Sequence, residues 1–148
     1  MKNSKAPLPF RILIADDDED DIQLTRDCFI DNNLYVSIHE VADGQYLLDR
    51  LKEDSKMITD TALPQLILLD LNMPRKGGFE ALAEIKADIV LCKIPVIVFT
   101  TSKATKDIEK AYELGASCFV NKPNTLDEWC DKMGQLGRFW MECVKLAV

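Results

Sequence analysis

Four short apolar runs in this chain of 148 residues each end at polar residues. The runs are 12–15, 66–69, 96–99 and 118–120, and the residues that follow them include Asp16, Asp70, Thr100 and Lys122. Short runs rich in Ile, Val, Leu and Phe that alternate with helical stretches are typical of buried strands in a parallel sheet. Since ligands bind outside the carboxyl ends of such strands, these polar side chains are predicted to meet at one edge of the sheet.

Strand and helix signals alternate five times along the chain, which favours a doubly wound α/β fold with a parallel sheet. The remaining strand is expected at about 35–41. The stretch 52–63 is mostly polar, which predicts a surface loop. Pro74 and the glycines that follow it predict another loop, before a helix at 79–87. Gly115 stands where a left-handed residue is expected to end a helix.

The composition fits one folded domain with a sizeable core, because 47% of the residues are apolar. A formal net charge of −7, without a clustered basic run, argues against direct nucleic-acid binding. No apolar stretch approaches the ~20 residues that span a membrane, and the first residues lack the apolar segment of a signal peptide. We therefore expect a flexible N-terminus at 1–9, a single domain at 10–148, a cytoplasmic location and no membrane contact.

The cysteines give a further indication of the compartment. The chain has five of them, namely Cys28, Cys92, Cys118, Cys130 and Cys143. They are widely spaced and odd in number, and they form no C-x-x-C pair. We expect all of them to be reduced core residues of a cytosolic protein.

The polar residues at the strand ends suit the transfer of a phosphoryl group to a carboxylate. Asp70 is the candidate nucleophile, through an acyl-phosphate intermediate. The candidate oxygen ligands for Mg²⁺ are Asp16, Asp17, Asp70 and the backbone carbonyl of Asn72. Lys122 would neutralise one phosphate oxygen, and Thr100 would donate its hydroxyl to another. Catalysis of such a transfer depends mostly on positioning and on cationic stabilisation of the transition state.

The acidic run 16–21 has other interpretations. By itself it is more often a solvated helix start, in which Asp18 or Asp20 caps the free N–H groups. Its spacing also resembles a calcium-binding loop, but Asp21 stands where an EF-hand requires Gly, and Asp27 stands where Glu is expected. We therefore reject the EF-hand. The presence of Asp70 after a second apolar run favours the magnesium site over a simple cap.

Taken together and in order, these motifs resemble the receiver domains of two-component response regulators over about residues 10–136. The resemblance implies a flavodoxin-like receiver fold, with a five-stranded parallel sheet of order 2-1-3-4-5 flanked by five helices. It implies that Asp16 and Asp17 are the metal-binding acidic pair and that Asp70, in Leu-Leu-Asp-Leu-Asn-Met-Pro, is the phosphoacceptor. It also implies that Thr100 is the switch hydroxyl and Lys122 the phosphate-pairing lysine.

The same resemblance assigns further features around the fifth strand and the phosphoacceptor. Phe119, three residues before the lysine, is similar to the aromatic switch residue that couples phosphorylation to the protein surface, and Asn72 to the residue that gives a carbonyl to magnesium. The bond between Lys122 and Pro123 is expected to be cis, which X-Pro bonds adopt readily. Asn121 departs from the family pattern, because an apolar residue is more usual before the lysine.

The C-terminal segment predicts a helix of about 20 residues with an apolar stripe. The stripe consists of Leu126, Trp129, Met133, Leu136, Trp140 and Cys143. Its distal part would expose an apolar patch of Phe139, Trp140, Met141 and Val144 unless something covers it. The sequence is compatible with two ways of covering this patch, namely a homodimer through it or a fold-back onto the chain's own core. The tail and the long loop after the second helix also resemble the small stand-alone regulators paired with bacterial and cyanobacterial phytochromes.

Three classes of function follow from these residues. The leading one is a single-domain response regulator that a sensor histidine kinase, with phytochromes among the candidates, phosphorylates on Asp70 in a Mg²⁺-dependent reaction. It would signal through contacts with a downstream protein or a phosphotransfer protein, and it would act as a switch rather than as an enzyme. The second is a phosphatase of the haloacid-dehalogenase type, which requires a second Asp where Asn72 stands. The third is a phosphate-independent interaction scaffold.

Overall fold

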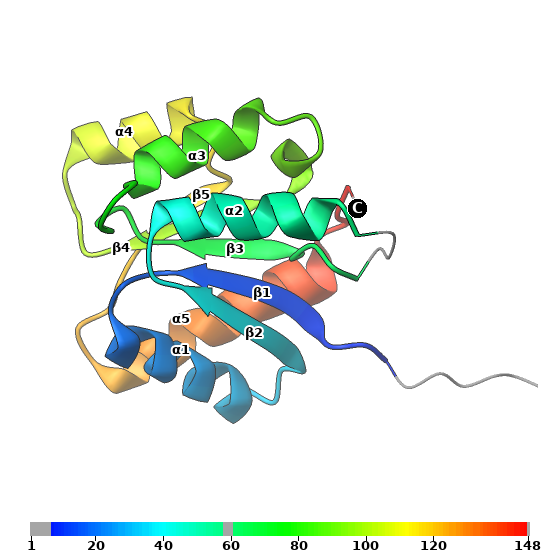
Figure 1. Ribbon diagram of the computed structural model, residues 1–148. Helices are drawn as coiled ribbons and strands as arrows, with labels where there is room; N and C mark the ends of the chain where they lie inside the picture. The colour runs from blue at the N-terminus through cyan, green and yellow to red at the C-terminus, as the bar shows by residue number, and fades with distance from the viewer. Residues whose placement is uncertain (1–6, 58–60, 148) are drawn as a thin grey trace, which may run out of the picture.

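The computed structural model describes residues 7–57 and 61–147, which form a five-stranded parallel sheet between two layers of helices (Figure 1). The strand order is β2-β1-β3-β4-β5, which confirms the predicted fold class. The strands are β1 (Phe10–Ala15), β2 (Val36–Val41), β3 (Leu66–Leu69), β4 (Val96–Thr100) and β5 (Cys118–Asn121). The helical elements are α1 (Glu19–Asp31), α2 (Gly44–Ser55), α3 (Gly78–Ala87), the 3₁₀ turn η1 (Leu91–Lys93), α4 (Thr105–Glu113), α5 (Leu126–Arg138) and the π-helical turn η2 (Phe139–Cys143).

The central strands bury side chains on both faces. Leu13, Ile67 and Val98 belong to the core beneath α2, α3 and α4, whereas Ile12 and Phe99 belong to the core against α1 and α5. Successive residues of a strand point to opposite faces, so covering both faces requires an uninterrupted apolar run. This requirement explains why the strands were visible in the sequence.

The strand register fixes the edge of the sheet at which the polar residues collect. Ala15 of β1 lies opposite Leu69 of β3, and the backbone N–H of Asp70 donates to the carbonyl of Ala15 at 2.9 Å. The N–H of Lys122 donates to the carbonyl of Thr100 at 2.8 Å, across β4 and β5. Main-chain hydrogen bonds thus hold Asp70 beside the end of β1 and Lys122 beside the end of β4.

The loops differ in part from the prediction. The expected loop at 52–63 begins later, because α2 continues to Ser55 with its buried side chains on one face and polar ones outside. The centre of that loop, 58–60, and most of the expected flexible N-terminus, 1–6, lie outside the described residues. Gly115 has φ +101° after α4, as the cap prediction requires. No helix in the described ranges is long and apolar enough to cross a bilayer.

The expectation that all five cysteines are reduced is wrong for two of them. Cys28 of α1 and Cys130 of α5 form a disulfide, with their Cα atoms 4.6 Å apart. Both helices pack on the same face of the sheet, and the Asn32 side chain donates to the carbonyls of both cysteines at 2.8 and 2.9 Å. Helix packing therefore brings together two residues that are 102 positions apart in the sequence. The free thiols are Cys92 and Cys118, which are half-buried, and Cys143, which is exposed, so the expectation of a core position is wrong for Cys143.

The expected cis bond before Pro123 is also wrong. All peptide bonds among residues 7–57 and 61–147 are trans. Trans is the form that X-Pro bonds prefer by about 0.5–1 kcal/mol. Lys122 reaches the acidic site with this trans bond in place.

The C-terminal helix is shorter and less regular than predicted. It ends at Arg138 and continues as the π-helical turn, in which the N–H of Val144 donates to the carbonyl of Phe139 at 3.0 Å. Leu126, the expected start of the apolar stripe, is 61% exposed. The buried stripe instead begins at Trp129 and continues with Met133.

Candidate functional site

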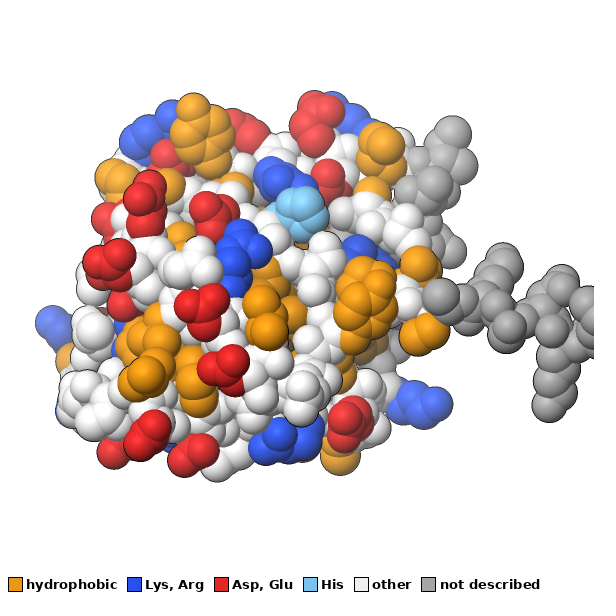
Figure 2. Space-filling model, turned by 90° about the horizontal axis from the view of Figure 1, so that it is seen from below, with side chains coloured by type: hydrophobic (Ala, Val, Ile, Leu, Met, Phe, Trp, Pro, Cys, Tyr) orange, Lys and Arg blue, Asp and Glu red, His pale blue; other side chains and the backbone are white. Residues whose placement is uncertain are grey.

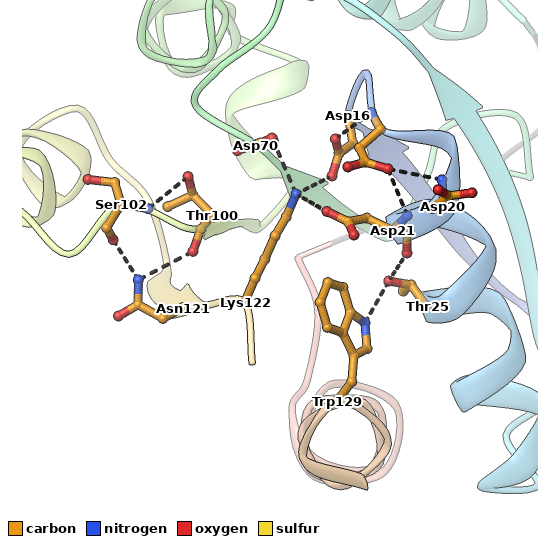
Figure 3. A network of polar contacts seen from close by, with 11 residues as sticks. Asp16, Asp20, Asp21, Thr25, Asp70, Thr100, Ser102, Asn121, Lys122 and Trp129 are labelled. Atoms are coloured by element: carbon orange, nitrogen blue, oxygen red, sulfur yellow. Dashed lines mark hydrogen bonds and ion pairs between the residues drawn. The ribbon is translucent and has the colours of Figure 1, made fainter. Parts of the chain in front are cut away.

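Lys122 lies at the centre of the polar cluster (Figure 3). Its Nζ contacts one carboxylate oxygen each of Asp16 at 2.7 Å, Asp21 at 2.8 Å and Asp70 at 3.3 Å. Asp16, Asp70 and Lys122 are buried, so water screens these contacts only weakly. One cation thus serves three carboxylates, which leaves the cluster with excess negative charge.

The donor set fits a divalent cation. Asp16, Asp17 and Asp70 each offer a carboxylate oxygen, and these oxygens all lie within 4.8 Å of one another. The second carboxylate oxygen of Asp70, Oδ1, is buried and has no hydrogen-bond partner among the described residues. A buried anionic oxygen without a partner is costly, and a hard cation that prefers oxygen ligands removes the cost. Asn72 is exposed in the loop between β3 and α3.

Burial and charge shift the pKa values of the two central groups in the same direction. Burial raises the pKa of Asp16 to about 6, although hydrogen bonds from Lys122 and from the N–H of Asp18 oppose the shift. Burial would lower the pKa of Lys122, but the hydrogen bonds to Asp16 and Asp21 outweigh it and raise that pKa. Lys122 therefore stays an ammonium at neutral pH.

Thr100 lies fully buried at the end of β4, next to the cluster but not bonded to it. Among the hydrogen bonds of the described residues, its hydroxyl only accepts from the N–H of Ser102, at 3.4 Å. Asn121 donates from its side-chain amide to the carbonyls of Thr100 and Ser102. The hydroxyl of Ser102 bonds Asp107 of α4 at 2.6 Å. Asn121, the departure from the family pattern, thus ties the loop after β4 to β5.

Phe119 lies on β5 and is half-buried. It packs against the core beneath α2, α3 and α4, and its backbone N–H donates to the hydroxyl of Tyr112 on α4 at 3.1 Å. Lys122, three residues later, carries its side chain into the acidic cluster instead. β5 therefore supplies a residue to the α4 side of the molecule, and the residue directly after β5 enters the site.

Comparison with known proteins identifies the family. Residues 12–133 match the response regulator receiver domain family. The chain belongs to this family. It is 33% identical over 138 residues to the response regulator Rcp1 of Synechocystis, an alignment that covers 93% of each chain.

Solved structures of other response regulators have the same fold as this receiver domain. The phosphorylated cyanobacterial phytochrome response regulator RcpA superimposes with a TM-score of 0.85 at 31% identity, over 95% of this chain and 99% of the other. The Mn²⁺-bound form of Rcp1 superimposes with a TM-score of 0.83 at 32% identity, over 95% and 100%. Family membership does not favour the alternative functions raised from the sequence.

Sequence reasoning missed one charged member of the cluster in this receiver domain. Asp18 caps α1, as expected, by accepting from the N–H groups of Asp20 and Asp21. The side chain of Asp21 turns instead to Lys122. Its backbone carbonyl accepts from the Thr25 hydroxyl at 2.8 Å, and that hydroxyl accepts from the Trp129 indole N–H at 3.1 Å. The only signal in the sequence was the spacing of Asp21 and Thr25, one helical turn apart.

His39, the single histidine of the chain, lies at the surface on β2 and is the pale-blue side chain in Figure 2. The same view shows acidic side chains spread among the basic ones over this face. The exposed His39 is thus a surface residue.

Proposed function

We propose that this receiver domain accepts a phosphoryl group on Asp70 from the phosphohistidine of a sensor histidine kinase, and that it signals through protein contacts. One observation carries the proposal: the ammonium of Lys122 lies between Asp70 and two further carboxylates, and the other Asp70 oxygen is buried without a partner. The cluster thus combines a carboxylate nucleophile with a fixed cation and a set of oxygen ligands. Residues 10–148 would act as one unit in this role.

The proposed reaction is an in-line displacement at phosphorus. An oxygen of Asp70 forms the new P–O bond while the P–N bond to the donor imidazole breaks, and the electron pair of that bond returns to the imidazole nitrogen. Lys122 neutralises charge on a phosphoryl oxygen, because its raised pKa keeps it charged. Thr100 would turn its hydroxyl toward another oxygen. Thr100 and Phe119 would then report phosphorylation to the α4 side of the molecule.

The proposed cofactor is Mg²⁺, held by Asp16, Asp17, Asp70 and the carbonyl of Asn72. When bound, it would neutralise the excess carboxylate charge and the charge of the incoming phosphoryl oxygens. The Mn²⁺-bound form of Rcp1 supports a divalent cation in this family.

The affinity for Mg²⁺ is expected to depend on pH. A carboxylate must lose its proton to bind the cation, and the pKa of Asp16 is raised to about 6. The apparent affinity should therefore be constant above that pH and fall by roughly tenfold per pH unit below it. Titrations with Mg²⁺ between pH 5 and 8, followed by tryptophan fluorescence, measure this dependence. An Asp16→Asn variant should bind Mg²⁺ more weakly and lose the step near pH 6. A pH-independent affinity in the wild-type protein would contradict the assignment of Asp16.

The proposed partners are a histidine kinase and a downstream or phosphotransfer protein, and the proposed location is the cytoplasm. The relative RcpA supports a phytochrome as the kinase, because it is a cyanobacterial phytochrome response regulator. Direct contact with nucleic acid or membrane is not part of the proposal, in line with the net charge of −7.

Incubation with acetyl phosphate, with and without Mg²⁺, tests the function directly. Intact-protein mass spectrometry should show the addition of one phosphoryl group that depends on Mg²⁺. No addition under either condition would leave the chain as a phosphate-independent scaffold.

We also propose a homodimer through the C-terminal patch. Phe139 is 52% exposed and meets the Trp140 ring edge-on, with the ring centroids 5.5 Å apart. Trp140 and Leu136, with Cys118 and Val120 of the edge strand β5, line an apolar groove beside it. Trp140 packs partly against the chain's own core, so the fold-back alternative holds for this ring. The exposed ring of Phe139 is the part that a second copy would cover.

Replacing Phe139 by Asp is expected to lower the apparent mass in sedimentation equilibrium from that of a dimer to that of a monomer. A charge placed in an apolar interface must be desolvated without a partner, which opposes association. Ile89→Asp is the matched control, because Ile89 is 85% exposed and does not line this groove, and the mass should not change. If the wild-type protein sediments as a monomer, the homodimer is excluded, and only the fold-back of the C-terminal patch onto the chain's own core remains.

A further inference from the structure

Asp21 contacts the active-site lysine more closely than the phosphoacceptor does. The distance from Lys122 Nζ is 2.8 Å to Asp21 Oδ2 and 3.3 Å to Asp70 Oδ2. The Asp21 carboxylate does not belong to the oxygen cluster that suits a metal ion, which comprises Asp16, Asp17 and Asp70. Its contact with the lysine therefore needs an explanation of its own.

The hydrogen-bonding capacity of the lysine sets up a competition. An ammonium has three donors, and in this structure three carboxylates occupy them. A phosphoryl oxygen on Asp70 can gain a hydrogen bond from Lys122 only if one of these contacts is given up. Asp16 and Asp70 remain tied to the site through the proposed metal, whereas Lys122 is the only cationic partner of Asp21 among the described residues. Loss of the Asp21 contact would therefore free the lysine to move toward the phosphoryl group.

Asp21 is also held in place from the other side of α1. Its backbone carbonyl accepts from Thr25, whose hydroxyl accepts from the Trp129 indole (Figure 3). Trp129 is buried on α5, so the first turn of α1 is fixed against α5 at this point. The backbone of Asp21 is therefore held in place, and its carboxylate could follow the lysine toward the phosphoryl group only by a change of side-chain rotamer.

We propose that Asp21 is a positioning residue that holds Lys122 in the unphosphorylated state and competes with the phosphoryl group for its ammonium. This inference rests on the proposed function. Its consequence is that Asp21 lowers the stability of the phosphorylated form relative to the unphosphorylated one. Removing the charge of Asp21 while keeping its shape should release the lysine to the phosphoryl oxygens.

The test measures the affinity for beryllofluoride, a stable mimic of the phosphoryl group, in saturating Mg²⁺, by tryptophan fluorescence. Asp21→Asn should bind it roughly 3- to 10-fold more tightly than the wild-type protein, as expected when one carboxylate charge is removed from a partly screened site. Asp20→Asn is the matched control, since Asp20 is exposed, carries the same charge and makes no contact with Lys122. Its affinity should stay within about twofold of wild type.

A conservative variant separates charge from structure. Asp21→Glu keeps the negative charge and should stay closer to wild type than Asp21→Asn does. The inference would be overturned if Asp21→Asn bound beryllofluoride with the same affinity as Asp20→Asn, or more weakly than the wild-type protein. It would also be overturned if Asp21→Asn and Asp21→Glu raised that affinity equally. If the wild-type protein binds no beryllofluoride and accepts no phosphoryl group, the proposed function itself fails. If the wild-type protein does both and Asp21→Asn has no effect, only the role of Asp21 fails.

Discussion

Asp70→Asn is expected to abolish phosphoryl acceptance from acetyl phosphate. The carboxamide has no anionic oxygen to attack phosphorus, and its nitrogen is a poor nucleophile because its electron pair is delocalised. The loss should be complete, since in the described site no other carboxylate combines burial, an unpartnered oxygen and contact with Lys122. Intact-protein mass spectrometry in Mg²⁺ measures the fraction of chains that carry one added phosphoryl group.

The control for this experiment is the same substitution at Asp20, in the exposed start of α1. It changes the net charge equally but touches neither the lysine nor the phosphoacceptor, so labelling should remain near that of the wild-type protein. Asp70→Asn should stay folded, because it removes one like charge from a cluster with excess negative charge. Labelling of the Asn variant to the wild-type level would remove Asp70 from the role of phosphoacceptor.

The fold was predictable because its strands are buried on both faces. The runs at 12–15 and 66–69 contain no polar residue, and such runs between amphipathic helices allow few arrangements other than a doubly wound sheet. The polar residues at their ends then had to meet at one edge, as Asp16, Asp70 and Lys122 do. Here the sequence pattern and the site geometry follow from the same constraint.

Contacts between helices were not predictable in the same way. The disulfide of Cys28 with Cys130 and the hydrogen bond of Thr25 with Trp129 both depend on how α1 and α5 pack. Periodicity shows which face of a helix is apolar, but it does not show which residues of two helices lie opposite each other. The contact of Asp21 with Lys122 was not predictable for the same reason, since it depends on the placement of the start of α1 beside Lys122.

The C-terminal stripe shows the limit of a regular helical pattern. Six apolar residues at helical spacing predicted one continuous face, yet Leu126 is exposed and the helix changes to a π turn at Phe139. A π turn closes its hydrogen bonds over one more residue than an α turn, so it rotates every later side chain away from the expected face. Such turns have no reliable sequence signal, so the sequence does not show where the regular stripe ends.

Lys122→Met is expected to lower the free energy of unfolding by about 3 kcal/mol at pH 8 without Mg²⁺. The substitution keeps much of the apolar stem but leaves the carboxylates of Asp16, Asp21 and Asp70 without their shared cation. Urea unfolding measures the change. Lys132→Met, on the exposed side of α5, is the control and should change the free energy by less than about 0.5 kcal/mol.

Two conditions should restore part of the stability of Lys122→Met. In the wild-type protein the pKa of Asp16 is raised to about 6, and the hydrogen bond from Lys122 opposes that rise, so the pKa should lie higher in the variant. A carboxyl with a raised native pKa destabilises the fold when ionised, so the variant should gain stability as the pH falls from 8 through that pKa. Mg²⁺ should also stabilise it by neutralising the same carboxylates. A variant as stable as the wild-type protein at pH 8 without Mg²⁺ would mean that the carboxylates do not need the lysine, which would remove the electrostatic basis of the site.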